Sequence, residues 1–161
     1  MIHLLSPREL PMSENLRLFL FSDHRSPADL PLDRKMVAAT GVTHPTVAWI
    51  PSGGSPEKTD RYLTDRQARY AEVGVTSVEM FPLHRQTYHL SLPHLLSHDI
   101  VHLSGGNPFV FLKNLRAVNL LSALSERARR GGVMVGESGG AMMMAHDIEC
   151  AASAISPSPR I

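Results

Sequence analysis

Short apolar runs alternate along this chain with longer stretches in which hydrophobic and polar residues mix. Apolar runs bounded by turn residues are typical of buried strands, and the mixed stretches between them are typical of helices that cover a sheet. The expected strands are Leu16–Phe21, Thr46–Ile50, Ser77–Phe81, Ile100–Leu103 and Val133–Val135. This alternation predicts an α/β fold with a mainly parallel sheet between layers of helices.

The stretches between these strands carry helix signals. Ser55 before Pro56 is a typical helix start, and Gly74 is a natural end. A helix is expected after the fourth strand, and its expected inward face consists of Phe109, Leu112 and Leu115. A second helix should follow before the last strand, and an apolar helix should begin at Ala141. The stretch that contains His84, His89, His94 and His98 is interpreted as a polar connector.

Length and composition narrow the classes of protein to consider. A chain of 161 residues with 43% hydrophobic and 19% charged residues suits one globular domain. We expect a loose N-terminal arm over 1–15 and a single α/β domain over 16–161. The net charge of +1 favours neither nucleic acid nor membrane as a partner. The only cysteine, Cys150, excludes an internal disulfide, so a cytoplasmic location is expected.

Candidate chemistry begins at Gly136-Glu137-Ser138-Gly139-Gly140, between the last strand and the helix expected after it. In the pattern G-x-S-x-G, a serine on a tight strand-to-helix turn stands at the carboxyl edge of the sheet, where it can act as a nucleophile. The backbone N–H of Gly139 is placed to donate to an oxyanion. The alternative is a tight turn in which Ser138 only caps a helix.

A second glycine turn, Ser104-Gly105-Gly106-Asn107, also follows a strand and precedes a helix. Parallel strands bring such turns to the same edge of the sheet, where glycines allow a ligand to approach the backbone closely. The N–H groups of Gly106 or Asn107 would then face the same reacting carbonyl as Ser138. Taken alone, this turn could equally be a glycine-rich helix cap.

Together these motifs resemble peptidase family S51, which includes dipeptidase E and cyanophycinase. The resemblance lies in TVAWIPSGG, IVHLSGGNPFVFLKNLR and VMVGESGGAMMMAHDI, and it covers about Leu16 to Ile148. It implies a flavodoxin-like three-layer sandwich related to the class I glutamine amidotransferases, with serine in place of their cysteine nucleophile. It also implies a serine-type peptidase that cleaves small peptides through an acyl-enzyme.

Matched by motif, the resemblance implies that Ser138 is the catalytic nucleophile, that Gly106 and Gly139 supply the oxyanion hole, and that Asn107 shapes the turn or lies near the substrate. The family usually has alanine at the position of Gly139, and the glycine is expected to loosen the elbow. No cofactor and no metal are expected, because the nine histidines form no compact ligand motif such as H-E-x-x-H. The expected partner is a small peptide, and a homodimer is left open.

The catalytic base is not identified by the sequence. In the family the histidine follows the serine by some tens of residues, whereas the only histidine after Ser138 here is His146. On a regular helix it would lie about 12 Å along the axis from Ser138, too far for a direct hydrogen bond. The other candidate bases are His84, His89, His94, His98 and His102, and the candidate acids are Asp147 and Glu149.

Three explanations remain for the missing base. We expect C-terminal truncation, with the loss of further elements of the fold. The alternatives are a histidine supplied by an unexpected segment or a second subunit, and a catalytically inactive flavodoxin-like binding or interaction domain that retains the elbow.

Overall fold

The computed structural model describes residues 15–24, 27–86, 89–145 and 147–149. The strands are β1 (Arg17–Phe21), β2 (Thr46–Ile50), β3 (Ser77–Met80), β4 (Ile100–Leu103) and β5 (Val133–Glu137). The helices are α1 (Leu30–Thr40), α2 (Pro56–Ala71), α3 (Leu92–Ser97), α4 (Pro108–Ala117), α5 (Leu120–Arg129) and α6 (Gly139–Met142). Residues 1–14 of the arm predicted over 1–15, and the segment 150–161, lie outside the described residues.

All five strands are parallel and form one sheet in the order β1-β5-β4-β2-β3. The predicted α/β fold with a parallel sheet between helices is therefore confirmed. β4 and β5 are buried almost throughout, which explains why both are continuous apolar runs in the sequence. β1 and β3 are the edge strands.

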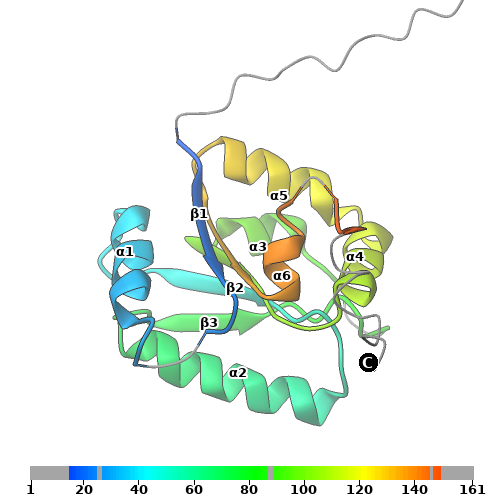
Figure 1. Ribbon diagram of the computed structural model, residues 1–161, viewed down its shortest axis with the longest axis horizontal. Helices are drawn as coiled ribbons and strands as arrows, with labels where there is room; N and C mark the ends of the chain where they lie inside the picture. The colour runs from blue at the N-terminus through cyan, green and yellow to red at the C-terminus, as the bar shows by residue number, and fades with distance from the viewer. Residues whose placement is uncertain (1–14, 25–26, 87–88, 146, 150–161) are drawn as a thin grey trace, which may run out of the picture.

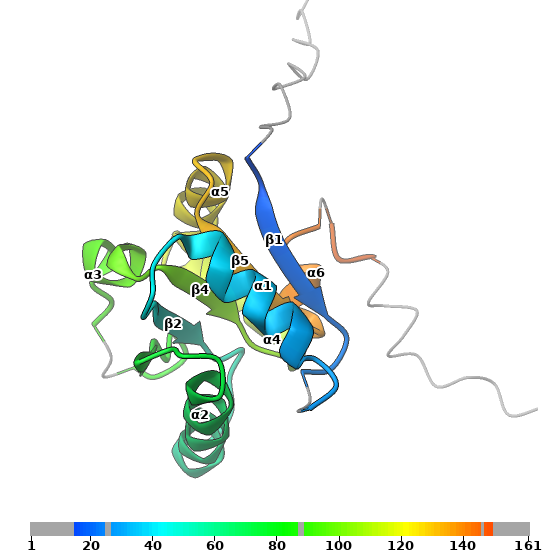
Figure 2. The ribbon, with the colours of Figure 1, turned by 90° about the vertical axis from the view of Figure 1, so that its left-hand side faces the viewer.

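Two hydrophobic clusters cover the two faces of the sheet. One face packs against α1 and α2 through Met36 and Tyr70, both fully buried. The other face packs against α3, α4 and α5 through Leu95, Phe111 and Leu124. Figure 2 shows α1 lying across its face, and Figure 1 shows α6 directly after β5. The result is a three-layer sandwich in which the first two helices cover one face of the sheet and the next three cover the other.

Three local expectations were wrong. Phe109 does not face the core but is 44% exposed, because α4 begins at Pro108 and turns Pro108, Phe111 and Leu115 inward. The expected polar connector contains the helix α3, packed on the core through buried Leu95. The elbow helix α6 begins at Gly139, before Ala141, and spans only four residues. The predicted cap at Ser55 is confirmed, since its side chain accepts from the Lys58 N–H.

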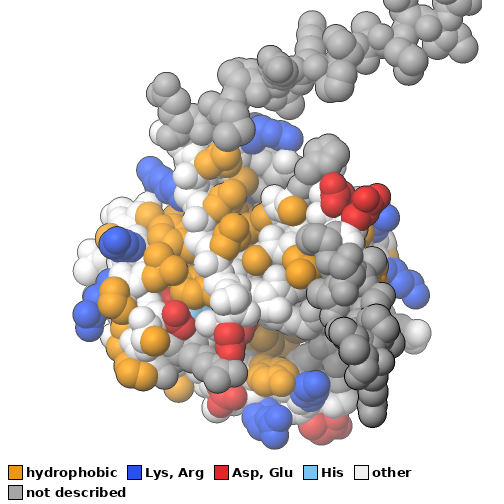
Figure 3. All heavy atoms as spheres, viewed as in Figure 1, with side chains coloured by type: hydrophobic (Ala, Val, Ile, Leu, Met, Phe, Trp, Pro, Cys, Tyr) orange, Lys and Arg blue, Asp and Glu red, His pale blue; other side chains and the backbone are white. Residues whose placement is uncertain are grey.

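The edge strand β1 has an apolar outer surface. Leu16, Leu18 and Leu20 are 38%, 39% and 52% exposed, and Figure 3 shows hydrophobic side chains gathered over this strand. None of the described helices has the length and apolar character that a membrane span requires.

Candidate active site

The first glycine turn lies where the direction of the chain crossovers changes, and the second lies beside it, after the neighbouring strand β5. From β2 the chain passes through α2 outward to β3, whereas from β4 it passes through α4 and α5 to β5 on the other side. β2 and β4 are hydrogen-bonded neighbours, so the crevice beyond their carboxyl ends is the switch point of the sheet. Open α/β sheets bind ligands at this position.

Ser138 sits on a strained turn between β5 and α6. Its φ and ψ are 47° and −113°, and the only other non-glycine residue with positive φ in the described part of the chain is Asn119. Such a conformation costs on the order of 1–3 kcal/mol and persists only where surrounding contacts enforce it. The Ser138 N–H donates to the Phe21 carbonyl of β1 over 2.8 Å, while the residue itself is exposed.

The two turns pack backbone against backbone. A Cβ on Gly139 would overlap the Gly106 carbonyl oxygen, and a Cβ on Gly105 would lie 3.6 Å from the Ser138 Cβ. The lack of a side chain at Gly139 therefore allows the two turns to approach closely. The sequence had suggested a different effect of this glycine, a looser elbow. The structure brings Gly105 and Gly106 together with Ser138 and Gly139, as their positions after neighbouring strands predicted.

Two serine side chains hold the first turn in place. The hydroxyls of Ser52 and Ser104 both donate to the Gly105 carbonyl, over 2.9 and 3.0 Å. The Ser104 hydroxyl also accepts from the Ser52 N–H. Because the C=O and N–H of a trans peptide point in opposite directions, the Gly106 N–H is directed away from both serines. Ser52 was not among the sequence candidates, since only the tertiary structure places it against Gly105.

The same reasoning applies to the elbow. The Ser138 carbonyl accepts from the N–H groups of Ala141 and Met142 in the first turn of α6. The Gly139 N–H belongs to the same peptide group as that carbonyl and therefore points away from α6.

Asn107 caps α4. Its side-chain oxygen accepts from the N–H groups of Phe109 and Val110, over 3.0 and 3.2 Å. This accounts for the expected turn-shaping role, and contact with a substrate stays a prediction.

A pocket of about 330 Å³ opens beside the two turns. Its lining includes Ser52, Gly105, Gly106 and Glu137, the residue before Ser138. Both signs of charge line it, since its lining also includes Lys58 and Arg66 of α2 and the carboxylates of Asp23 and Glu137. The volume lies at the lower end of the range for small-molecule sites.

Glu137 is held ionised beside the pocket. Its carboxylate accepts a hydrogen bond from the Arg66 guanidinium over 3.0 Å and another from the backbone N–H of His24 over 3.4 Å. Burial alone would raise the pKa of Glu137, but His102 and Arg66 outweigh this effect and lower the pKa to about 2. Arg66 also contacts the His24 ring, so Glu137 is joined to the buried cluster of His24, Asp33 and Arg69.

His102 was a candidate base, but it lies fully buried in β4. Its Nδ1 is 2.7 Å from the Tyr70 hydroxyl, and its Nε2 is 3.7 Å from the Glu137 carboxylate, longer than a hydrogen bond. Burial raises the pKa of Tyr70 above its ordinary value, so its neutral O–H is available to donate to Nδ1. Burial also lowers the pKa of His102 to about 4, although Glu137 opposes the shift. His102 is therefore neutral at pH 7.

This buried histidine predicts a loss of stability in weak acid. Between about pH 6.5 and pH 4 the unfolded chain binds a proton at His102 that the folded chain does not, so stability falls as the pH falls through this window. The expected loss is roughly 2–3 kcal/mol. Urea unfolding at pH 7, 5.5 and 4.5 measures it. The variant His102→Asn should lose most of this dependence, whereas His44→Asn, at an exposed histidine, should retain it. Equal pH slopes for His102→Asn and the wild type would contradict the assignment.

The other candidate residues are dispersed. His94 and His98 lie against Glu79 of β3, away from the elbow. Burial lowers the pKa of His84, which follows β3. Within residues 15–24, 27–86, 89–145 and 147–149, no histidine is hydrogen-bonded to the Ser138 hydroxyl, and His146 lies outside these ranges. Among the candidate acids, the Asp147 carboxylate accepts from the Glu149 N–H.

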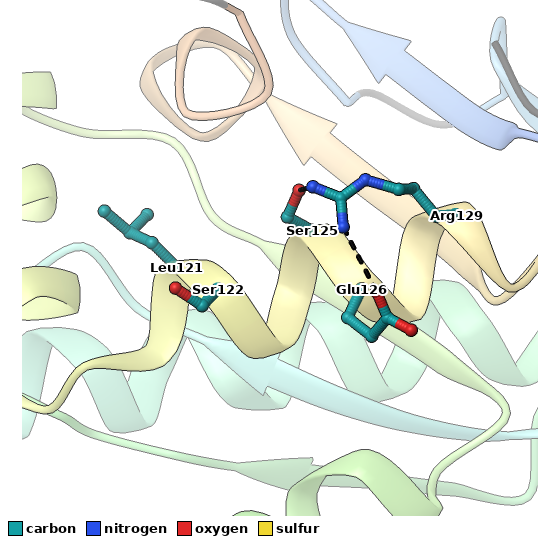
Figure 4. Close-up of a pocket in the computed structure, with 5 residues that line it drawn as sticks. All are labelled: Leu121, Ser122, Ser125, Glu126 and Arg129. Atoms are coloured by element: carbon teal, nitrogen blue, oxygen red, sulfur yellow. Dashed lines mark hydrogen bonds and ion pairs between the residues drawn. The ribbon is translucent and has the colours of Figure 1, made fainter. Parts of the chain in front are cut away.

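A second, more open hollow lies on α5, and it shares no lining residue with the pocket beside the two turns. It is lined by Leu121, Ser122, Ser125, Glu126 and Arg129 (Figure 4). Arg129 donates to both Glu126 and Ser125, so the charges of this helix face satisfy one another. The hollow brings together none of the predicted site residues.

The fold and the two turns together define an α/β protein with a serine on a strand-to-helix elbow, one strand away from the switch point of a parallel sheet. Residues 18–159 match Peptidase family S51, and the chain belongs to this family. The predicted family resemblance is confirmed.

Relatives by sequence include two proteins of Pasteurella multocida (strain Pm70). An uncharacterized peptidase, PM1590, is 25% identical over 133 residues, which cover 83% of this chain and 62% of that protein. Peptidase E is 29% identical over 103 residues, which cover 64% of this chain and 42% of that protein. The chain therefore spans less than two thirds of the length of either relative.

Solved structures show the same fold. A peptidase from an acI-B1 Actinobacterium superposes with a TM-score of 0.67 at 18% identity, over 81% of this chain and 57% of that one. A putative peptidase E protein from Listeria monocytogenes EGD-e gives a TM-score of 0.55 at 22% identity, over 79% of this chain and 61% of that one. At these identities the likeness concerns the fold.

Proposed function

We propose that this chain carries the nucleophile and the oxyanion hole of a serine-type peptidase that cleaves small peptides through an acyl-enzyme. Membership of peptidase family S51 supports peptide hydrolysis as the reaction class. The observation that carries the proposal is the strained, exposed Ser138 at the β5–α6 turn. A strained elbow lifts a serine hydroxyl out of the sheet edge so that a carbonyl carbon can approach it.

The backbone around Ser138 supports an oxyanion hole. The Gly106 N–H is turned away from Ser52 and Ser104, and the Gly139 N–H is turned away from α6, while the two glycines are in contact. In the proposed reaction the Ser138 oxygen attacks the peptide carbonyl, and both N–H groups donate to the oxygen that becomes negative. Donors held in place before the reaction stabilise that charge without reorganisation.

Proton transfer requires a base that the described residues do not bring to Ser138. In the proposed mechanism a histidine takes the Ser138 proton and later returns it to the leaving amine. We propose that this histidine comes from a part of the natural protein outside the described residues. The second candidate function is a binding domain that retains the elbow without catalysis. It is favoured by the fact that no described histidine is hydrogen-bonded to the Ser138 hydroxyl.

A fluorophosphonate probe separates these functions, because it reacts with activated serines. We expect stoichiometric labelling of the folded protein, complete loss in Ser138→Ala, and wild-type labelling in the control Ser122→Ala, at an exposed serine on α5. Ser52→Ala should label about tenfold more slowly, because the Gly105–Gly106 peptide loses one of its two anchors. Absence of labelling in folded protein that includes any natural C-terminal extension would contradict the proposal and support a binding domain.

A further inference from the structure

We propose that Glu79, His94 and His98 form a binding site for one divalent transition-metal ion, with Zn²⁺ as the preferred ion. The carboxylate comes from the edge strand β3, and the two imidazoles come from α3 and its C-terminal cap. Glu79 is paired in register with Ala48, which belongs to the core cluster on the α3 face of the sheet. Strand alternation thus turns Glu79 towards α3 and its neighbour Val78 towards the other face.

The three side chains converge on one point. The His94 Nε2 is 2.8 Å from the Glu79 Oε2, and the His98 Nε2 is 3.5 Å from the same oxygen. One ligand atom from each of the three residues lies within 4.8 Å of the other two. Tetrahedral Zn²⁺ with ligands at about 2.0–2.1 Å separates its ligand atoms by about 3.3 Å. Glu79 and His94 are partly exposed, so their side chains have room to rotate towards that geometry around the buried His98.

The hydrogen bond of His98 to the backbone leaves one ring nitrogen for a ligand. The His98 Nδ1 lies 3.1 Å from the His94 carbonyl oxygen, which only accepts, so Nδ1 carries the proton of that hydrogen bond. The other ring nitrogen, Nε2, is therefore the atom that faces the Glu79 carboxylate, at 3.5 Å, and it is the atom that a metal ion between the two would use. A backbone carbonyl on the far ring nitrogen is the usual way to orient a metal-binding histidine.

The surroundings hold the ligands in place. His98 is only 6% exposed, and the Phe81 ring lies 5.4 Å from the His98 ring and 5.7 Å from the His94 ring. Arg127 of α5 donates to the carbonyls of His98 and Asp99 and so fixes the backbone at the end of α3. The less mobile histidine is therefore preorganised, and the other two ligands can close on the ion.

The donor set determines the class of ion. Two imidazole nitrogens and one carboxylate oxygen suit Zn²⁺, Co²⁺ or Ni²⁺, whereas Mg²⁺ and Ca²⁺ prefer oxygen ligands alone. The side chains of His94 and Glu79 are 52% and 45% exposed, so water can complete the coordination shell. His94 and His98 have the spacing H-x-x-x-H, but the third ligand is supplied by a different strand. For this reason the three ligands form no compact motif in the sequence, and no metal was expected there.

Zn²⁺ titration of the full chain, stripped of metal with a chelator, tests the site by calorimetry. We expect saturable binding of one Zn²⁺ with a Kd in the micromolar range or tighter, and a melting temperature that rises with Zn²⁺ concentration. Co²⁺ should give the visible absorption of a low-symmetry nitrogen and oxygen site.

The variants Glu79→Gln and His94→Ala remove partly exposed ligands, so both should fold, which the unfolding transition without metal verifies. Each should weaken Zn²⁺ binding at least about tenfold. His44→Ala removes an exposed histidine elsewhere and should leave binding unchanged. The proposal fails if the folded wild type shows no saturable binding, or if Glu79→Gln and His94→Ala bind Zn²⁺ as tightly as His44→Ala does. Either result would reduce the cluster to an ion pair.

Discussion

Gly140→Ala should destabilise the protein by about 3 kcal/mol or more, although alanine is the better helix former. Gly140 lies in α6 and is buried against the end of β4. An added Cβ would overlap the Leu103 carbonyl oxygen and lie 2.6 Å from that of Ser104. These are backbone atoms at the end of an interior strand, so relief requires α6 to move away from the sheet. Ser138 and the elbow would move with it.

Urea unfolding monitored by circular dichroism measures this effect. Gly41→Ala is the matched control, because Gly41 has a φ of 72° but no atom within 4 Å of an added Cβ. It should cost only about 1 kcal/mol, from backbone strain alone. A Gly140→Ala protein as stable as wild type would show that α6 does not pack against β4 as closely as described.

Asp33→Ala is expected to cost about 3–5 kcal/mol, because it leaves a buried cation without its partner. Asp33 is fully buried in the first turn of α1, where its carboxylate binds the His24 ring at 2.6 Å and the Arg69 guanidinium. Arg69 is itself only 6% exposed, so water cannot replace the lost carboxylate. His24 also contacts Arg66, the partner of Glu137, so the loss should reach the edge of the pocket.

The same unfolding measurement applies, with Asp60→Ala as control. Asp60 pairs with Arg85, but its side chain is 59% exposed, and the control should cost less than about 1 kcal/mol. The double variant Asp33→Leu/Arg69→Met removes both charges and should recover a large part of the loss. If Asp33→Ala is no more destabilising than Asp60→Ala, the buried ion cluster does not contribute to stability as its geometry indicates.

All five strands of the sheet were predicted from the sequence, because each lies in a short run rich in apolar residues that ends at glycine, proline or a polar turn. The helix α1 was not predicted, and α3 was interpreted as part of a connector, because helices this weakly amphipathic carry little periodic signal. Phe109 was misplaced because helical spacing alone does not set the rotation of a helix about its axis. The burial of Pro108, Phe111 and Leu115 sets it here.

For the candidate site, the sequence by itself determined the two glycine turns and the position of Ser138 between β5 and α6. Glycine and serine have conformational and chemical properties that are local, so their order along the chain already carries that information. The tertiary structure decided which groups surround them. It placed Ser52 on the Gly105 carbonyl, Arg66 on Glu137, and Glu79 beside two histidines of another element. These contacts join residues far apart in the chain, and only the packing of helices on the sheet brings them within reach.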